Sequence, residues 1–386
     1  MLHSNNDLVL LIDDDRLVRT SVATALEREG RTVLACSDIE SAQVLMETFP
    51  IRAAVADVRL SGAFAFEGLD FIDYAHEKRP AMRVVLISGD ISAELRIEAA
   101  ARGAAALLQK PCLVADIEAA IAIDAGAHGT AESHTIHVPD MDEVLGNNRL
   151  HNFYQPIVRA GEGKLFAFGY ESLARISIDA SLNNPEILFR YAERKKRLID
   201  LELACLQNTF RTSERVPAGS RIFLNVHPRV LSSGDRFSNA VVAMAQRQQI
   251  ALNRFVFEIT EQGELSADAA TMNCIARLRD LGAAFAFDDL GIAYSHLCHV
   301  PAVRPQFLKI SQHFGTGFEA DPFRRKIVCN IASLAKDLGV EAILEGVETR
   351  ETADAARDIG ITLMQGYFFG RPADVSQLRT TVVEVN

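Results

Sequence analysis

Short apolar runs alternate with stretches of helical period along the first 124 residues. The runs cover residues 8–12, 32–35, 53–56, 84–87 and 105–108. Five apolar strands separated by amphipathic helices are typical of a doubly wound, flavodoxin-like parallel α/β sheet. The residues that follow are rich in Gly, Ala, Ser and His and contain Pro139, which predicts a linker over 125–144.

The same alternation resumes after the linker. The predicted strands cover residues 165–170, 222–226, 254–257, 283–287, 306–310, 341–344 and 361–364. Near-continuous apolar strands with helices between most of them favour a parallel (β/α)8, TIM-like barrel, which takes about 250 residues. We therefore expect a doubly wound domain over 6–124 and a barrel domain over 145–380.

Composition narrows the class of protein. Hydrophobic residues make up 48% and charged residues 24%, as in globular proteins, and no run of 18 or more apolar residues predicts membrane insertion. The first residues lack the basic region of a secretory signal, so we expect a cytoplasmic protein. The net charge of −11, without a basic cluster or a helix-turn-helix segment, disfavours direct DNA binding. Six scattered cysteines with no Cys-x-x-Cys pair suggest neither disulfides nor a zinc ribbon.

Polar side chains follow several strands of the first predicted sheet. Asp13 and Asp14 follow the first strand and Asp57 ends the third, so parallel strands bring them to one edge. Such carboxylates suit one Mg²⁺, while Ser88 and Lys110 add a hydroxyl and an ammonium that can hold a phosphoryl group on Asp57. Each acid alone is more simply a helix cap or a solvated residue, but five such residues on one edge favour the functional interpretation.

Residues 6–124 resemble a response-regulator receiver domain on these motifs. The resemblance implies that Asp57 is the phosphoacceptor, that Asp13 and Asp14 hold Mg²⁺, and that Ser88 and Lys110 sense the phosphoryl group. It also implies a sensor histidine kinase as partner. Leu107 stands where many receivers carry a switching aromatic residue, and the loop over 61–66 is longer than usual.

A second set of polar residues follows the apolar runs of the predicted barrel. Its members are Glu171, Asn225, Glu258, Asp288, Asp289, Lys309, Glu345 and Gln365. Residues at these positions face the carboxyl-terminal mouth of a barrel, where carboxylates gathered together need cations. The ligand candidates carry only oxygen donors, which favours two Mg²⁺ or Mn²⁺ over zinc: Glu171, Asn225, Glu258, Asp288 and Asp289.

Two such metals about 3.5–4 Å apart would activate a shared water for displacement at a phosphodiester. Lys309 would hydrogen-bond this water, or deprotonate it if the neighbouring groups lower its pKa enough. Glu345 and Gln365 would complete the polar wall. The alternative is that these acids cap helices or pair with arginines, which is plausible for one residue but not for the whole set.

The barrel residues resemble the EAL-domain family of cyclic di-GMP phosphodiesterases over about 145–375. The signature reads YESLAR over 170–175, with Ser172 in place of the alanine that gives the family its name. Further matches are YQPI (154–157), LNVHP (224–228), FEITE (257–261), the Asp288–Asp289 pair, LKI (308–310), LEGVET (344–349) and QGY (365–367).

The resemblance implies hydrolysis of cyclic di-GMP to linear pGpG by a site with two metals. In addition to the metal ligands named above, it implies that Lys309 positions the water and that Glu345 and Glu171 take part in catalysis. The substrate contacts it implies are Arg175, Gln155 and Gln365, and the loop supports are Glu261 and Glu348.

Three departures from the family pattern affect the expected activity. The loop over 288–296 reads DDLGIAYSH, so it lacks a threonine hydroxyl and a glycine of the usual DDFGTGYSS. Ile176 replaces a tryptophan and Ser311 replaces an acidic residue, which predicts a looser substrate fit.

Two hypotheses follow from the complete motifs and the altered loop. The first is a homo-oligomeric response regulator that hydrolyses cyclic di-GMP under control of Asp57 phosphorylation, with activity lowered by the loop. The second is an EAL-like module that binds cyclic di-GMP or a protein partner with weak or no hydrolysis.

Overall fold

The structure is a computed structural model that describes residues 7–27, 31–60, 67–122, 134–137, 139–146, 149–161, 164–177, 185–260, 265–290, 297–378 and 381–384. The chain divides into two compact units. The first comprises Met1–Arg149 and Ile176–Arg197, and the second comprises Leu150–Arg175 and Leu198–Asn386. Among the described helices, none combines the length and the apolar character of a membrane span.

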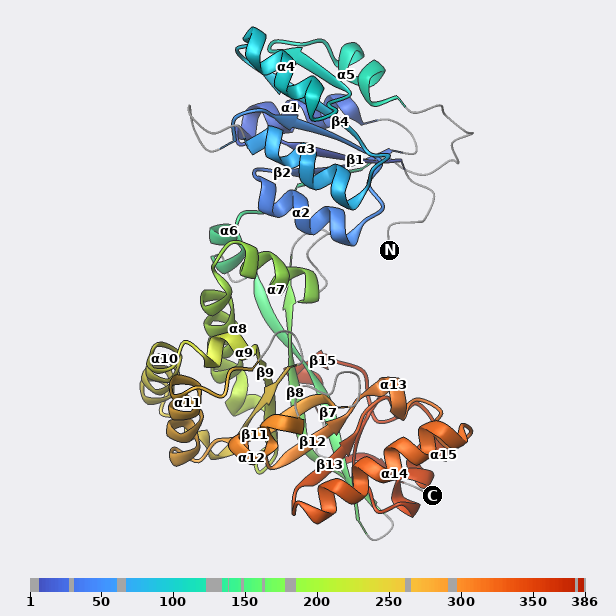
Figure 1. Ribbon diagram of the computed structural model, residues 1–386. Helices are drawn as coiled ribbons and strands as arrows, with labels where there is room; N and C mark the ends of the chain where they lie inside the picture. Colours follow the sequence, from blue (N-terminus) through green and yellow to red (C-terminus); the bar gives the residue numbers. More distant parts are fainter. Residues whose placement is uncertain are drawn as a thin grey trace. The chain divides into compact units, whose positions relative to one another are not determined.

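The first unit is built on a parallel sheet with strand order β5-β4-β3-β1-β2-β6 (Figure 1). The strands are β1 (Asp7–Ile12), β2 (Arg31–Cys36), β3 (Ala53–Asp57), β4 (Arg83–Ser88), β5 (Ala106–Gln109) and β6 (His134–His137). The helices between the first five strands and after them are α1 (Arg16–Leu26), α2 (Ile39–Thr48), α3 (Glu67–Lys78), α4 (Ala93–Ala101) and α5 (Val114–Ile121). The predicted doubly wound fold is confirmed.

The central strands of this sheet are buried on both faces. Leu10, Leu34 and Ala54 lie on neighbouring strands and are all fully buried. This double burial explains why the strands read as continuous apolar runs rather than as alternating patterns. At the carboxyl end of β1, the side chain of Asp15 caps α1 by accepting hydrogen bonds from the backbone N–H groups of Leu17 and Val18.

Three further elements belong to the first unit. Strand β6 and helix α6 (Met141–Leu145) lie largely within the range predicted as a linker, and β6 pairs with β2 as the sixth strand. Helix α7 (Pro185–Arg194) packs against α2, where Arg194 donates a 2.6 Å hydrogen bond to the side chain of Gln43. Arg190 and Arg194 also pair with Glu47 on α2.

The second unit contains a closed barrel of eight strands. They are β7 (Leu150–Ala160), β8 (Lys164–Ile176), β9 (Arg221–Val226), β10 (Phe255–Ile259), β11 (Ala284–Leu290), β12 (Phe307–Ile310), β13 (Glu341–Leu344) and β14 (Leu363–Gln365). Neighbouring strands pair in this order, and the barrel closes because β7 pairs with both β14 and β8. The short strands β15 (Ala373–Asp374) and β16 (Thr381–Glu384) extend it on β7 and β8. The predicted TIM-like barrel is confirmed.

One barrel strand runs against the others and was not among the predicted strands. Strand β7 pairs antiparallel with β14, whereas the ladders from β8 to β14 are parallel. Buried and half-buried residues alternate along the first half of β7, which is typical of a half-exposed strand and gives no continuous apolar run.

Helices and short turns connect the barrel strands. The helices are α8 (Leu198–Thr212), α9 (Pro228–Leu231), α10 (Asp235–Arg247), α11 (Ala269–Asp280), α12 (Val300–Val303), α13 (Gln312–Gly315), α14 (Pro322–Asp337) and α15 (Arg350–Asp358). The 3-10 turns are η1 (Ser213–Arg215), η2 (Leu252–Arg254), η3 (Leu297–His299) and η4 (Val375–Gln377).

Aromatic residues fill part of the barrel interior. The ring centroids of Phe223 and Phe307 lie 5.3 Å apart, and Phe168 lies 5.8 Å from Phe307. Successive side chains on a strand point to opposite faces, so residues two positions farther along share the interior with these rings. Those residues on β9 and β12 are Asn225 and Lys309. A polar layer therefore lies above an aromatic layer.

Candidate active site

Lys309 on β12 is the centre of the polar layer. Its side chain is 1% exposed, and its Nζ lies 2.8 Å from Glu345, 3.0 Å from Glu258, 3.1 Å from Asp288 and 3.4 Å from Glu171. These four carboxylates come from four different strands or strand ends. The structure therefore brings together most of the acids predicted to face the mouth, and it places the lysine among them.

The charge state of Lys309 follows from this environment. Burial alone would lower its pKa, but the surrounding carboxylates, Asp288 and Glu171 foremost, outweigh burial and raise the pKa well above its ordinary value. The condition for deprotonating a water, a lowered pKa, is therefore not met in the metal-free protein. Lys309 carries its proton and can donate hydrogen bonds to groups in the mouth.

Glu171 on β8 is held by amide groups as well as by the lysine. Asn225 Nδ2 donates to its Oε1 at 2.9 Å, and Gln365 Nε2 donates to its Oε2 at 2.6 Å. Burial would raise the pKa of Glu171, but the charge of Lys309 and these hydrogen bonds lower it. Gln365 also donates to Gln155 Oε1 at 3.2 Å, so two of the three predicted substrate residues contact each other and one of them contacts Glu171.

Glu258 on β10 has the least compensated carboxylate of the cluster. It is fully buried, its Oε1 lies 3.0 Å from Lys309 Nζ, and its Oε2 receives no hydrogen bond within the described part of the chain. Burial raises its pKa well above the ordinary value. An unpartnered, buried carboxylate oxygen is costly unless a cation meets it, so this donor set fits hard divalent ions.

A small cavity opens beside these residues. Its volume is about 220 Å³, and it is lined by Glu171, Asp288, Asp289, Glu345 and Gln365 together with Gln155, Gln312, Gly346, Glu348, Gly366 and Tyr367. The predicted loop support Glu348 thus lines the cavity itself. Glu261 and the altered positions 291–296 lie outside the described residues.

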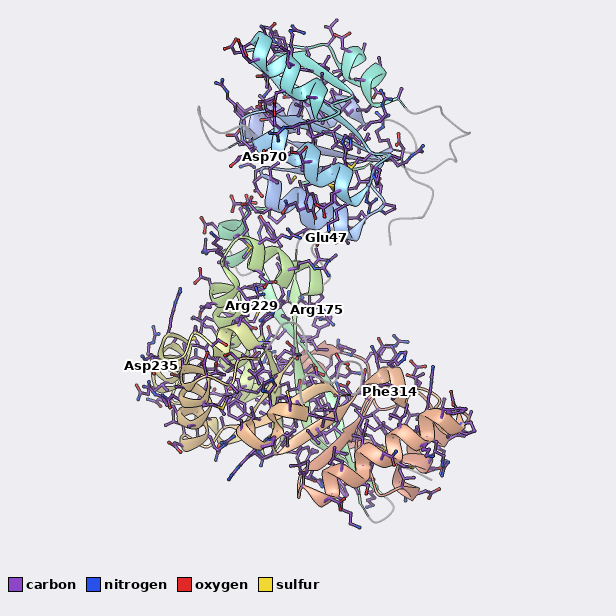
Figure 2. All side chains as sticks on the ribbon, viewed as in Figure 1. Glu47, Asp70, Arg175, Arg229, Asp235 and Phe314 are labelled. Carbon is purple, nitrogen blue, oxygen red and sulfur yellow. The ribbon has the colours of Figure 1, made fainter. Side chains whose placement is uncertain are left out.

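Arg175 lies near the end of β8 (Figure 2). It is not among the residues that line this cavity. Its Nη1 donates a 2.8 Å hydrogen bond to the backbone oxygen of Ala174, and its guanidinium carbon lies 5.9 Å from the centre of the Phe153 ring. Arg175 is half-buried, and burial lowers its pKa although the charge of Glu171 opposes this shift.

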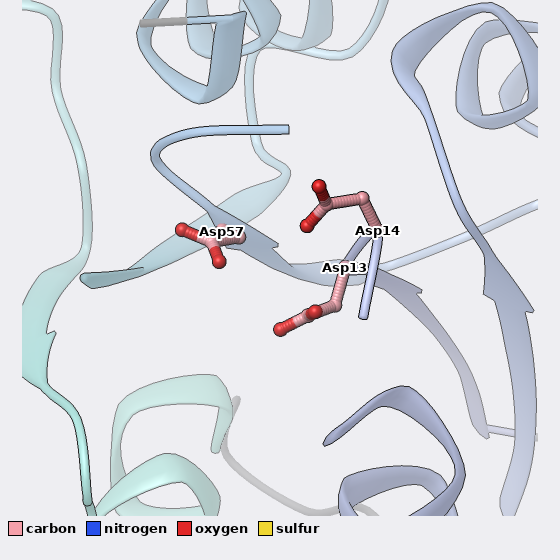
Figure 3. Close-up of side chains that lie close together, drawn as sticks. All are labelled: Asp13, Asp14 and Asp57. Atoms are coloured by element: carbon pink, nitrogen blue, oxygen red, sulfur yellow. The ribbon is translucent and has the colours of Figure 1, made fainter. Parts of the chain in front are cut away.

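The receiver residues converge as predicted at the carboxyl edge of the first sheet. Carboxylate oxygens of Asp13, Asp14 and Asp57 lie within 4.8 Å of one another (Figure 3). Lys110 Nζ lies 2.8 Å from Asp13 and 2.6 Å from Asp57. Burial raises the pKa of Asp13, while the two aspartates raise that of Lys110 against the opposing effect of burial. Three clustered carboxylates fit a hard cation.

Ser88 also lies at this edge, at the end of β4. Its hydroxyl donates to the backbone oxygen of Asp90 at 2.7 Å rather than to Asp57. Contact with a group on Asp57 therefore requires the hydroxyl to rotate away from this bond.

Two residues beside the barrel site were not found from the sequence. Ser311, noted there only as a departure, donates a hydrogen bond to Asp289. Glu202 on α8 is buried, and its Oε1 accepts a 2.7 Å hydrogen bond from the backbone N–H of His227, two residues after Asn225. Burial raises the pKa of Glu202 to about 8. Neither contact has a local sequence signal, since each joins distant segments.

Comparison with known proteins agrees with the two sites. The chain is 28% identical over 389 residues to the cyclic di-GMP phosphodiesterase RocR of Pseudomonas aeruginosa, covering 95% of this chain and 96% of that protein. It is 28% identical over 234 residues to the probable cyclic di-GMP phosphodiesterase PdeG of Escherichia coli, covering 59% of this chain and 46% of PdeG.

The barrel is also similar to solved structures. The PaMucR phosphodiesterase in complex with c-di-GMP superposes with a TM-score of 0.53 and 25% identity, covering 60% of this chain and all (100%) of that chain.

Two protein-family models match the chain. The family model of the response regulator receiver domain matches residues 9–122. The EAL domain model matches residues 140–372, and the chain therefore belongs to the EAL domain family, with a receiver domain before it.

Proposed function

We propose that this protein is a response regulator that hydrolyses cyclic di-GMP to linear pGpG. The observation that carries the proposal is the buried carboxylate cluster around Lys309 in the mouth of an EAL-family barrel. RocR, which shares both domains over nearly its whole length, is a cyclic di-GMP phosphodiesterase.

The residues that would hold two divalent ions are Glu171, Asn225, Glu258, Asp288 and Asp289. Bound Mg²⁺ or Mn²⁺ would supply an activated water and stabilise negative charge on the phosphodiester. Lys309, whose Nζ lies within 3.4 Å of four carboxylates of the cluster, would donate a hydrogen bond to the water. Gln155 and Gln365 would bind the substrate from the cavity wall, and Arg175 would contact a substrate phosphate.

The test is timed conversion of cyclic di-GMP by the full chain with Mg²⁺ or Mn²⁺. We expect the wild type to accumulate pGpG and Glu171→Ala to form none above background, because that change removes the carboxylate held by Asn225 and Gln365. Product formation is measured by chromatography. Tight cyclic di-GMP binding by a wild type that forms no more product than Glu171→Ala would instead support the binding module, which the altered sequence over 288–296 favours.

We further propose that phosphorylation of Asp57 by a histidine kinase controls hydrolysis. Asp57 and Lys110 are in contact beside a candidate Mg²⁺ site. Helix α7 is the segment that follows β8, the strand of Glu171 and Arg175, and it packs on receiver helix α2 within the first unit. A change in the receiver could thus reach α7 directly. We also propose that the protein forms a homo-oligomer, which the family resemblance supports.

The receiver assignment predicts the outcome of a labelling experiment. A small-molecule phosphoryl donor should label the wild type and leave Asp57→Asn unlabelled, because an amide cannot accept the phosphoryl group that the Asp57 carboxylate accepts. The readout is the mass of the intact protein after brief exposure with Mg²⁺. Equal labelling of both proteins would refute the assignment. Comparing the hydrolysis rates of the labelled and unlabelled wild type tests whether phosphorylation regulates hydrolysis.

A further inference from the structure

Ser311 lies at the junction between β12 and α13 and is completely buried. Its hydroxyl donates a 2.8 Å hydrogen bond to Asp289 Oδ1. The Ser311 hydroxyl oxygen also accepts a 3.3 Å hydrogen bond from the backbone N–H of His313 and so caps α13. One hydroxyl therefore connects a helix N-terminus to a carboxylate that lines the cavity.

Asp289 needs such support because its backbone is unusual. Its φ is 51°, in the left-handed region that residues with a side chain adopt at a cost, and the β11–β12 ladder is irregular between Phe287 and Leu290. At this irregularity the backbone does not hold the residue in a regular ladder. The described side-chain contact that fixes the direction of the Asp289 carboxylate is the hydroxyl of Ser311.

We propose that Ser311 is a positioning residue that sets the direction of the Asp289 carboxylate, and thereby the divalent-cation affinity of the site. This inference rests on the proposed two-metal function and concerns one ligand of it. The hydroxyl donates a hydrogen bond to the Asp289 carboxylate and adds no charge. The cluster already holds five acids and one lysine: Glu171, Glu258, Asp288, Asp289, Glu345 and Lys309.

The donor property of residue 311 leads to three different expectations. Ser311→Ala removes the hydrogen bond and leaves Asp289 free to turn away from the cavity. Ser311→Thr keeps a hydroxyl that can both donate and cap α13. Ser311→Asp places a second carboxylate against Asp289, which repels it in the absence of a cation and attracts a cation to the pair.

The experiment measures binding of Mn²⁺ to the full chain by titration calorimetry, without substrate. We expect Ser311→Ala to weaken the weaker of two Mn²⁺ sites about 10-fold or more, as removal of a residue that orients a metal ligand usually does. Ser311→Thr should bind within about 3-fold of the wild type. Ser311→Asp should bind Mn²⁺ more tightly and melt at a lower temperature in chelator than the wild type.

The matched control for the lost helix cap is Asp268→Ala, which removes the cap of α11 (its Oδ1 accepts a 2.8 Å hydrogen bond from Thr271 N–H) without touching the site. Asp268→Ala should bind Mn²⁺ like the wild type. Unchanged Mn²⁺ binding in Ser311→Ala, or an equal loss in Asp268→Ala, would overturn the positioning role. A wild type that binds no Mn²⁺ and forms no pGpG would overturn the proposed function and this inference together.

Discussion

Replacing Lys309 by methionine is expected to abolish measurable hydrolysis and to destabilise the metal-free barrel strongly. Lys309 is the cation that faces Glu171, Glu258, Asp288 and Glu345 within 3.4 Å. Removing one partner of a buried ion pair costs about 3–5 kcal/mol, because the other charge is left uncompensated. In a barrel of this size that loss lowers the melting temperature by on the order of 10 °C.

The same geometry predicts what restores the stability of the Lys309→Met variant. Divalent ions and protons both neutralise the uncompensated negative charge of the buried cluster, so Mn²⁺ should raise the melting temperature of the variant more than that of the wild type. In chelator, the difference in melting temperature between the wild type and the variant should become smaller from pH 8 to pH 5, because the carboxylates take up protons.

The control for the Lys309 experiment is Lys326→Met, which removes an exposed lysine of α14 and should change neither stability nor hydrolysis appreciably. Calorimetric melting with and without Mn²⁺ is the measurement. A Lys309→Met variant as stable as the wild type in chelator at pH 8 would show that the lysine does not hold the cluster together.

Glu202→Gln is expected to make the barrel less sensitive to alkaline pH. The carboxyl of Glu202 is buried and its pKa is about 8 in the folded protein, against an ordinary value of 4.5. Because the folded state holds this proton more tightly than the unfolded state, its contribution to stability is complete below about pH 4.5 and is lost as the pH rises to about 8. At about 1.4 kcal/mol per pKa unit, the loss is on the order of a few kcal/mol.

Glutamine keeps an oxygen that can accept the hydrogen bond from the His227 N–H, but it does not titrate. The variant should therefore lack this loss and exceed the wild type in free energy of unfolding at pH 8.5, with a smaller difference at pH 5. Urea unfolding of both proteins at pH 8.5 and pH 5 measures this difference in the free energy of unfolding. Glu214→Gln, which changes an exposed glutamate, is the matched control, and identical pH profiles for wild type and Glu202→Gln would contradict the prediction.

Much of the fold was predictable because most strands are buried on both faces. Continuous apolar runs located the first five receiver strands and seven of the eight barrel strands. Strand β7 was missed because its buried residues alternate with half-buried ones. Strand β6 was missed because four residues in a polar stretch carry no pattern of their own, and their pairing with β2 is a tertiary contact.

The candidate site was predictable where strand position decides it. Parallel strands deliver consecutive strand ends to one mouth, which is why Glu171, Glu258 and Asp288 meet around Lys309. The direction of the Lys309 pKa shift was not predictable, since it depends on distances of about 3 Å to four acids. The bonds from Ser311 to Asp289 and from Glu202 to His227 join residues 22 and 25 positions apart, so only the folded chain reveals them.

The path of the chain through α7 has a consequence for dissecting this protein. Residues 176–197 group with the first unit, although the EAL match extends over 140–372. Leu188, Tyr191 and Ala192 on α7 are at most 1% exposed, and Arg194 and Lys195 pair with acids on α2 and at its start. A shortened chain that begins after the receiver would expose this apolar helix face to solvent. It would also leave the basic residues of this segment without their acidic partners. The catalytic half studied alone would thus carry an additional apolar surface through which copies can associate.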